Sequence, residues 1–291
     1  MNLELQHGLF QVPGVENAEP VDCCISVQGN IQYRMLWEDM RESNPRDNVR
    51  FTRYRDPSFN SNGNSFDFDG HQISTQDFNR RVVRWEHDGS MTVIADSFNG
   101  KGLNSPNDLC FDTSGRIYFT DPRYGDRSDI EQDRMAVYRI ELDGALTRVI
   151  DDMQTPNGIL ISADNRTLYL VDNNLDPGGA RTLLAYDIDD AGICKRRGVL
   201  HDYGSGYGGD GMVLDIAGNI YLTAGDGAAA GIYIFTPTGE QLGFIQTPEI
   251  AGNCTFGGPD LCTLYIAASS SLYRIRLAIP GMLTYPNIRN A

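Results

Sequence analysis

The feature that most limits the possible folds is a short segment that recurs six times, a turn followed at once by an apolar and often tyrosine-bearing strand. The central apolar residues of these segments are spaced by 42, 44, 51, 52 and 44 residues, at Ile31, Ile73, Ile117, Leu168, Ile220 and Leu264. Repeats of about 40–50 residues are typical of four-stranded propeller blades. The spacing therefore predicts six units of similar structure.

A second recurring strand supports the same count. It occurs, for example, at 136–142, 231–235 and 271–277, and several copies end in a turn such as Asp88-Gly89 or Asp143-Gly144. Strands separated by frequent turns, without a long segment of helical periodicity, indicate an all-β protein. We predict a six-bladed β-propeller with four-stranded antiparallel blades, because ring closure buries most sheet edges. A two-sheet sandwich is the alternative.

The chain shows no linker, low-complexity tract or charge block that would divide it. Residues 1–15 are predicted to form an N-terminal arm, and residues 16–291 a single propeller domain. A β-rich domain of this length is common.

The charge and the cysteine content limit which molecules the protein is expected to bind and in which cellular compartment it is expected to lie. With 24 basic and 39 acidic residues the net charge is −15, which disfavours nucleic acid and anionic membranes as partners. No apolar run is long enough to span a bilayer, and the N-terminus lacks the features of a secretory signal. None of the six cysteines forms a Cys-x-x-Cys pair, so we expect reduced thiols in a cytoplasmic protein. One or two disulfides are the alternative, and the oligomeric state is not predicted.

Polar residues precede the innermost strands of several units. They are Glu19, the segment Asn104–Asp108, Asn157 and Asp210. Inner strands of a propeller converge on its axis, so these side chains are expected to share one central pocket. Their oxygen atoms suit Ca²⁺, Mg²⁺ or Mn²⁺, and less often Zn²⁺. The alternative for each residue is a turn former that bonds its own backbone.

Several longer motifs carry a resemblance to a known family. They are Ser61–Asp67, Asn79–Val82, Leu103–Asp108, Phe119–Pro122 with Tyr124-Gly125, Pro156–Gly158, Asp210–Met212 and Cys254–Gly258. In this order the chain resembles the gluconolactonase, regucalcin (senescence marker protein) and luciferin-regenerating enzyme family, closest to the gluconolactonase branch.

The resemblance implies a metal-dependent hydrolase that opens a sugar lactone or related cyclic ester through a metal-activated water in the central pocket. One divalent ion is expected, with Ca²⁺ the first choice and Mg²⁺, Mn²⁺ or Zn²⁺ as alternatives. The implied ligands are Glu19, Asn107, Asn157 and Asp210, with Glu16 competing for the place of Glu19. Asp210 and Asp108 are the predicted catalytic residues. The predicted substrate contacts are Asn107, Asn104, Lys101 and Tyr124.

Two positions depart from the gluconolactonase pattern. Gly102 stands where this branch often has arginine, and Thr75–Asp77 replace a segment that carries histidine. One alternative is therefore a non-sugar lactone, or another ring-opening or cyclising step in a specialised biosynthetic pathway. A non-enzymatic calcium-binding regulator or propeller scaffold is another alternative.

Overall fold

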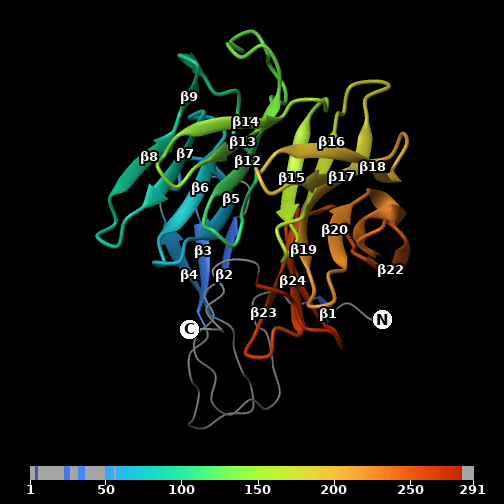
Figure 1. Cartoon of the computed structure of the whole chain (residues 1–291). Helices are drawn as coiled ribbons and strands as arrows, with labels where there is room; N and C mark the ends of the chain where they lie inside the picture. Colours follow the sequence, from blue (N-terminus) through green and yellow to red (C-terminus); the bar gives the residue numbers. More distant parts are fainter. Residues whose placement is uncertain (1–3, 6–22, 27–31, 37–49, 56, 284–291) are drawn as a thin grey trace.

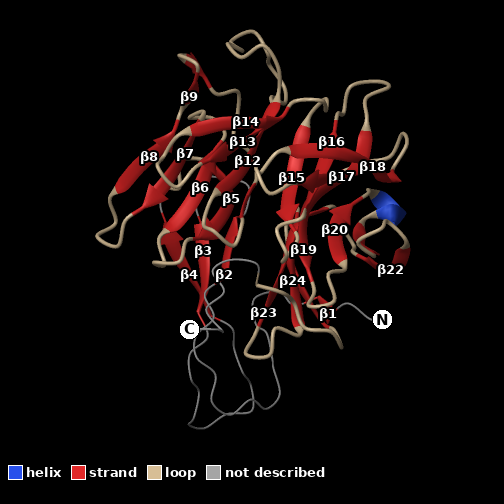
Figure 2. Cartoon of the chain, in the orientation of Figure 1, coloured by secondary structure: helices blue, strands red, loops and turns tan. Residues whose placement is uncertain are grey.

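The computed structural model describes residues 4–5, 23–26, 32–36, 50–55 and 57–283, and before residue 57 it describes the backbone alone. These residues form strands, turns and loops with one 3₁₀ helix at Gly227–Ala229, as Figure 2 shows. The predicted all-β class is thus confirmed. The same residues contain no helix with the length and apolar character needed to cross a bilayer.

Five sheets are four-stranded and antiparallel, and in four of them the strands follow one another in chain order (Figure 1). Four of them are β5–β8 (Ser61–Phe66, Gln72–Gln76, Arg81–Trp85, Met91–Ala95), β11–β14 (Leu109–Phe111, Ile117–Asp121, Ala136–Ile140, Leu146–Ile150), β15–β18 (Pro156–Ile161, Thr167–Asn173, Arg181–Ile188, Cys194–Asp202) and β19–β22 (Gly209–Leu214, Ile220–Ala224, Gly231–Phe235, Gln241–Gln246). The fifth is β23–β25 (Ala251–Gly257, Thr263–Ala268, Leu272–Arg276) with β1 (Glu4–Leu5) as its outer strand. A small hairpin, β9 (Ser97–Phe98) with β10 (Lys101–Gly102), follows β8.

The first unit differs from the prediction of six four-stranded blades. Its sheet, β2 (Cys23–Ser26), β3 (Gln32–Leu36) and β4 (Arg50–Arg55), has three strands in the described part of the chain. Only residues 56–60 separate β4 from β5, which leaves no length for an outer strand between them. The count is therefore corrected to five complete blades and one three-stranded sheet. The predicted N-terminal arm also contributes a strand, because β1 pairs with β25.

Consecutive blades from β5–β8 to β23–β25 pack against each other. Tyr118 lies in a cluster with residues of β15–β18, whereas the adjacent Phe119 lies in a cluster with Ile73 and Val82 of β6 and β7. Successive side chains of a strand point to opposite faces, so one strand serves two interfaces. Both aromatic side chains are fully buried. Burial of each such side chain stabilises the fold by about 1.5–3 kcal/mol, and the result is a rigid frame for the inner strands.

Cys110, Cys194, Cys254 and Cys262 are free thiols in the described residues, which agrees with the expectation of reduced cysteines there. Cys23 and Cys24 lie in β2, where side chains are not described. Burial raises the pKa of the Cys254 and Cys110 thiols, so both are poor nucleophiles. The cytoplasmic location stays a prediction.

Candidate active site at the inner strand ends

The innermost strands of four blades begin with the same irregularity in pairing. The register shifts between residues 61 and 64, 156 and 159, 209 and 212, and 251 and 253. Such bulges re-aim side chains, and they are over-represented next to active sites. The second residues of these strands are Asn62, Asn157, Asp210 and Gly252, and Asn107 holds the matching place before β11. Inner strands that follow one another in the chain lie in contact, which brings these residues together.

Two glycines allow neighbouring inner strands to approach each other closely. A Cβ atom on Gly158 of β15 would lie 1.9 Å from the carbonyl oxygen of Asp210 in β19. A Cβ atom on Gly63 of β5 would lie 2.8 Å from the Cα atom of Asp108. Both glycines follow an asparagine. Each Asn-Gly pair thus places a polar side chain next to a residue that has no side chain, where the neighbouring strand can come close. This coupling sets the spacing around Asp108 and Asp210.

Asp108 is held by its carboxylate between two strands. One oxygen accepts a hydrogen bond from its neighbour Leu109 N at 2.9 Å, and the other accepts from Ile159 N of β15 at 3.3 Å. Burial raises the pKa of Asp108 to about 6, although these two N–H groups lower it. Part of the residue remains accessible to solvent. Asp108 is therefore a fixed carboxyl group that can change its protonation state near neutral pH.

Asp210 forms the second carboxyl group of the site. Burial raises its pKa to about 7, the negative charge of Asp108 raises it further, and hydrogen bonding from Asn157 opposes the shift. Two carboxylates that share a desolvated site cannot both ionise without cost. A positive charge between them would remove this cost, and a proton on one of them removes it in the absence of a cation.

Asn157 and Tyr124 join this pair. The side-chain Nδ2 of Asn157 donates to the Tyr124 hydroxyl at 3.1 Å, and this hydroxyl donates to the carbonyl oxygen of Asn173 at 3.3 Å. Asn157 is buried, and its Oδ1 atom has no hydrogen-bond partner. Burial and the charge of Asp210 raise the pKa of Tyr124, so it stays neutral. The structure thus brings Asp108, Asn157, Asp210 and Tyr124 together, and their roles stay predictions.

Asn104 has partners within the protein. Its Nδ2 donates to the backbone oxygens of Asp121 and Arg134, both at 3.2 Å, and only 1% of the residue is exposed. The Asp121 carboxylate accepts from Asn104 N and Ser105 N at 2.8 and 2.7 Å. These bonds shape the loop that enters β11. They favour a structural role for Asn104, and its contact with substrate stays a prediction.

For the remaining predicted residues that lie in the described part of the chain, the structure gives backbone contacts or exposure, but no side-chain contact with the site. The backbone of Asn107 bonds across strands, since its oxygen accepts from Gly63 N at 2.7 Å and its N–H donates to Thr120 O at 2.9 Å. Lys101 is exposed in the β9–β10 hairpin. The metal-ligand role of Asn107 and the substrate contacts of Asn107 and Lys101 stay predictions. Glu19 and its alternative Glu16 lie outside the described residues.

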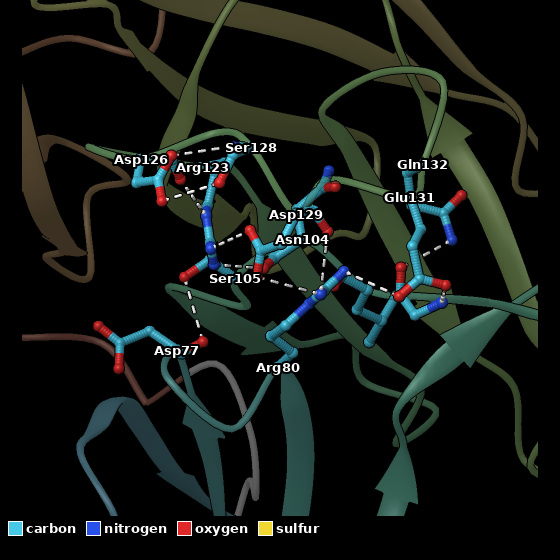
Figure 3. Close-up of polar contacts among 12 residues, drawn as sticks. Asp77, Arg80, Asn104, Ser105, Arg123, Asp126, Ser128, Asp129, Glu131 and Gln132 are labelled. Atoms are coloured by element: carbon cyan, nitrogen blue, oxygen red, sulfur yellow. Dashed lines mark hydrogen bonds and ion pairs between the residues drawn. The ribbon is translucent and has the colours of Figure 1, made fainter.

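A charged network fastens the loop at 101–105 to the loop that follows β12 (Figure 3). The Arg80 guanidinium donates to the carbonyl oxygens of Leu103 and Asp129. Arg123 donates to Asn104 O at 3.2 Å and pairs with the Asp129 carboxylate, so Asp129 lies between two arginines. A Cβ atom on Gly102 would lie 2.9 Å from Glu131 Oε1. The space beside Gly102 is thus taken by Glu131.

Two residues near the site were not found from the sequence. Tyr207 lies close enough to Asp210 for that charge to raise its pKa, after the larger effect of burial. Its place in the glycine-rich segment 204–209 was the only signal in the sequence. Asn173 ends β16, and its buried Oδ1 has no hydrogen-bond partner. No pattern pointed to Asn173, because its proximity to Tyr124 arises only in the folded chain.

The oxygen atoms gathered at this site could ligate a divalent cation. Asn157 Oδ1 is buried without a partner, and the carboxylates of Asp210 and Asp108 lie together in a desolvated place. These are hard oxygen donors of the kind that Ca²⁺ and Mg²⁺ prefer. Within residues 57–283, no group of three or more His, Cys, Asp or Glu side chains is arranged to hold a metal. A cation site among these residues would therefore need ligands of another kind, and Asn157 Oδ1 is available as one.

The fold is a β-propeller of antiparallel blades, with carboxylate and amide side chains at the starts of its inner strands. A family model described as SMP-30/Gluconolactonase/LRE-like region matches residues 34–270. The chain belongs to this family.

Similar proteins agree with this assignment. A gluconolactonase from Zymomonas mobilis is 38% identical over 64% of this chain and 54% of its own length. A lactonohydrolase from Aspergillus oryzae, named oryL, is 28% identical over 66% of this chain and 49% of its own length. The solved structure of a gluconolactonase from Xanthomonas campestris is 27% identical, has a TM-score of 0.71, and is matched over 87% of this chain and 81% of that one. The chain thus spans about half the length of the two curated relatives.

Proposed function

We propose that this chain hydrolyses a lactone at the cluster of Asp108, Asn157 and Asp210. The observation that carries the proposal is geometric: Asn157 Oδ1 is buried without a partner, and the strand that holds Asn157 contacts both Asp108 and Asp210. Burial raises the pKa values of these two carboxyl groups to about 6 and about 7. Catalytic groups with such values can exchange protons near neutral pH. The names of the relatives, gluconolactonase and lactonohydrolase, support a lactone as the substrate.

In the proposed reaction a water oxygen attacks the carbonyl carbon of the lactone. Asp210 accepts a proton from this water, the bond between the carbonyl carbon and the ring oxygen breaks, and the proton passes to the ring oxygen that leaves. The product is a hydroxy acid. Burial, and after it the negative charge of Asp108, raises the pKa of Asp210 toward the range that this exchange needs, and two backbone N–H groups fix Asp108 in place. The role requires no Ser-His-Asp triad.

We further propose that Asn157 and Asp210, with Asn107 and Glu19, hold one divalent cation. When bound, such an ion polarises a carbonyl and lowers the pKa of water. Ca²⁺ is the first choice because every proposed ligand is an oxygen atom. Asn104, Lys101 and Tyr124 are retained as proposed substrate contacts. We also propose that the three-stranded sheet β2–β4 completes a six-bladed ring, because β2 contacts β5.

The test is hydrolysis of gluconolactone with the spontaneous rate subtracted, before and after chelation. We expect Asp210→Asn to reduce kcat by about 10²–10⁴, the usual contribution of a general base. Asp202→Asn, an exposed carboxylate at the end of β18, serves as the control and should keep wild-type activity. Wild-type turnover by Asp210→Asn would contradict the catalytic assignment, and full activity after complete metal removal would contradict the cation.

A second candidate keeps the site and changes the substrate to a less polar lactone or ester. Two contacts favour it. Glu131 occupies the space where a side chain at position 102 would lie and accepts from Gly102 N, and the Arg80 guanidinium donates to the Leu103 carbonyl oxygen. The loop also lacks the arginine that often stands at position 102 in the gluconolactonase branch, and two Arg80 nitrogens donate to Leu103 and Asp129. A panel of sugar and alkyl lactones separates the two, because the second candidate requires a higher kcat/KM for the alkyl members. Cation binding without turnover on any lactone would instead favour a binding protein.

A further inference from the structure

Tyr124 connects two blades at the site. It lies in the loop after β12, in the blade β11–β14, but both of its hydroxyl contacts belong to the blade β15–β18. The hydroxyl accepts from Asn157 Nδ2 of β15 at 3.1 Å and donates to the Asn173 carbonyl oxygen of β16 at 3.3 Å. Tyr124 therefore bridges the inner two strands of the neighbouring blade.

The chemistry of a phenol fixes the direction of these bonds. A tyrosine hydroxyl has one hydrogen to donate, and a backbone carbonyl can only accept. Because the hydrogen is given to Asn173, the hydroxyl oxygen can only accept from Asn157. Asn157 must therefore present its NH₂ end to Tyr124, which leaves its Oδ1 as the end without a partner.

Asp210 is a second acceptor for the same NH₂ group, because its backbone lies against Gly158, the residue that follows Asn157. Without the Tyr124 hydroxyl, the amide is free to turn so that its NH₂ end serves Asp210 alone. An NH₂ group cannot ligate a cation, whereas Oδ1 can.

We propose that Tyr124 is a positioning residue for cation binding, which holds the Asn157 amide so that Oδ1 stays available. This inference rests on the proposed function, and it gives Tyr124 a role besides substrate contact. Partners of metal ligands typically contribute 10–100-fold to metal affinity. The hydroxyl of Tyr124 is such a partner, held in place by Asn173.

The experiment is calorimetric titration of the full chain with CaCl₂, with Mg²⁺ and Mn²⁺ as further probes. We expect Tyr124→Phe to weaken the Kd for the cation at least 10-fold, while urea unfolding of the cation-free protein changes little. Tyr203→Phe is the matched control, because it removes a buried hydroxyl that has no hydrogen-bond partner. It should bind the cation as the wild type does.

A double-mutant cycle separates orientation from a general loss of structure. In an Asn157→Asp background both ends of the side chain are oxygen atoms, so adding Tyr124→Phe should no longer weaken binding. Wild-type affinity in Tyr124→Phe, or an undiminished effect in the Asn157→Asp background, overturns the inference and leaves the proposed cation site intact. A wild-type chain that binds none of the three cations overturns both.

Discussion

At the scale of single residues, the site depends on a glycine whose lack of a side chain lets two strands come close. Gly158 carries no Cβ, and the carbonyl oxygen of Asp210 lies where that atom would be. The dihedral angles of Gly158 do not require glycine, since it is absent from the residues with positive φ. Its constraint is therefore steric, and it acts between β15 and β19.

We predict that Gly158→Ala destabilises the protein by at least about 1–3 kcal/mol, the usual cost of overpacking. The displacement of Asp210 should also lower the proposed lactone hydrolysis. Gly198→Ala is the control, because nothing lies within 4 Å of a Cβ atom there. Urea unfolding of both variants measures the difference. Equal stability of the two alanine variants would show that the strands can separate without cost.

At the scale of elements, two blades use the same device to hold the loop that enters the inner strand. Asp121 at the end of β12 accepts from the N–H groups of Asn104 and Ser105. Asp172 in β16 accepts from those of Gln154 and Thr155 at 2.9 and 2.7 Å. The Asp121 carboxylate thus fixes the loop that leads to Asn107 and Asp108, and the Asp172 carboxylate fixes the loop that leads to Asn157.

The titration of Asp121 predicts a dependence of stability on pH. Burial raises its pKa to about 7, against an ordinary value of 3.8, although its two backbone hydrogen bonds lower it. Between these pH values the folded chain keeps a proton that the unfolded chain has lost, so the free energy of unfolding falls as pH rises from about 4 to about 7. We expect Asp121→Asn to make this fall shallower.

Chemical denaturation at about pH 4, 5.5 and 7 measures that slope. Asp133→Asn is the control, because hydrogen bonding to Arg148 lowers the pKa of Asp133 to about 2, and its contribution lies below this window. The assignment fails if the slopes of wild type and Asp121→Asn coincide.

At the scale of the whole molecule, the last blade is completed by the start of the chain. Glu4 and Leu5 of β1 pair with Arg274 and Tyr273 of β25. A strand taken from the other end of the sequence covers the edge of β25, which would otherwise present unpaired backbone groups. This pairing joins the N-terminal segment to the residues that close the fold.

We predict that deletion of residues 1–5 lowers the melting temperature by several degrees, at roughly 2–4 °C for each kcal/mol lost. The exposed edge should also increase aggregation on heating. Deletion of residues 1–3 alone keeps β1 and is the control. Thermal unfolding with light scattering compares the two, and identical curves would mean that β1 adds nothing to the last blade.

The sequence by itself determined the all-β class and the repeated unit, and it predicted that Asp108, Asn157 and Asp210 belong to one site. Strand period, turn residues and blade spacing are local properties, so they can be read along the chain. Only the tertiary structure decided the three-stranded first unit and the pairing of β1 with β25. It also decided the partners of Asn104 and the bridge from Tyr124 to Asn157 and Asn173. The reason is physical, because those hydrogen bonds join residues that are far apart in the chain, 33 and 49 positions in the case of Tyr124.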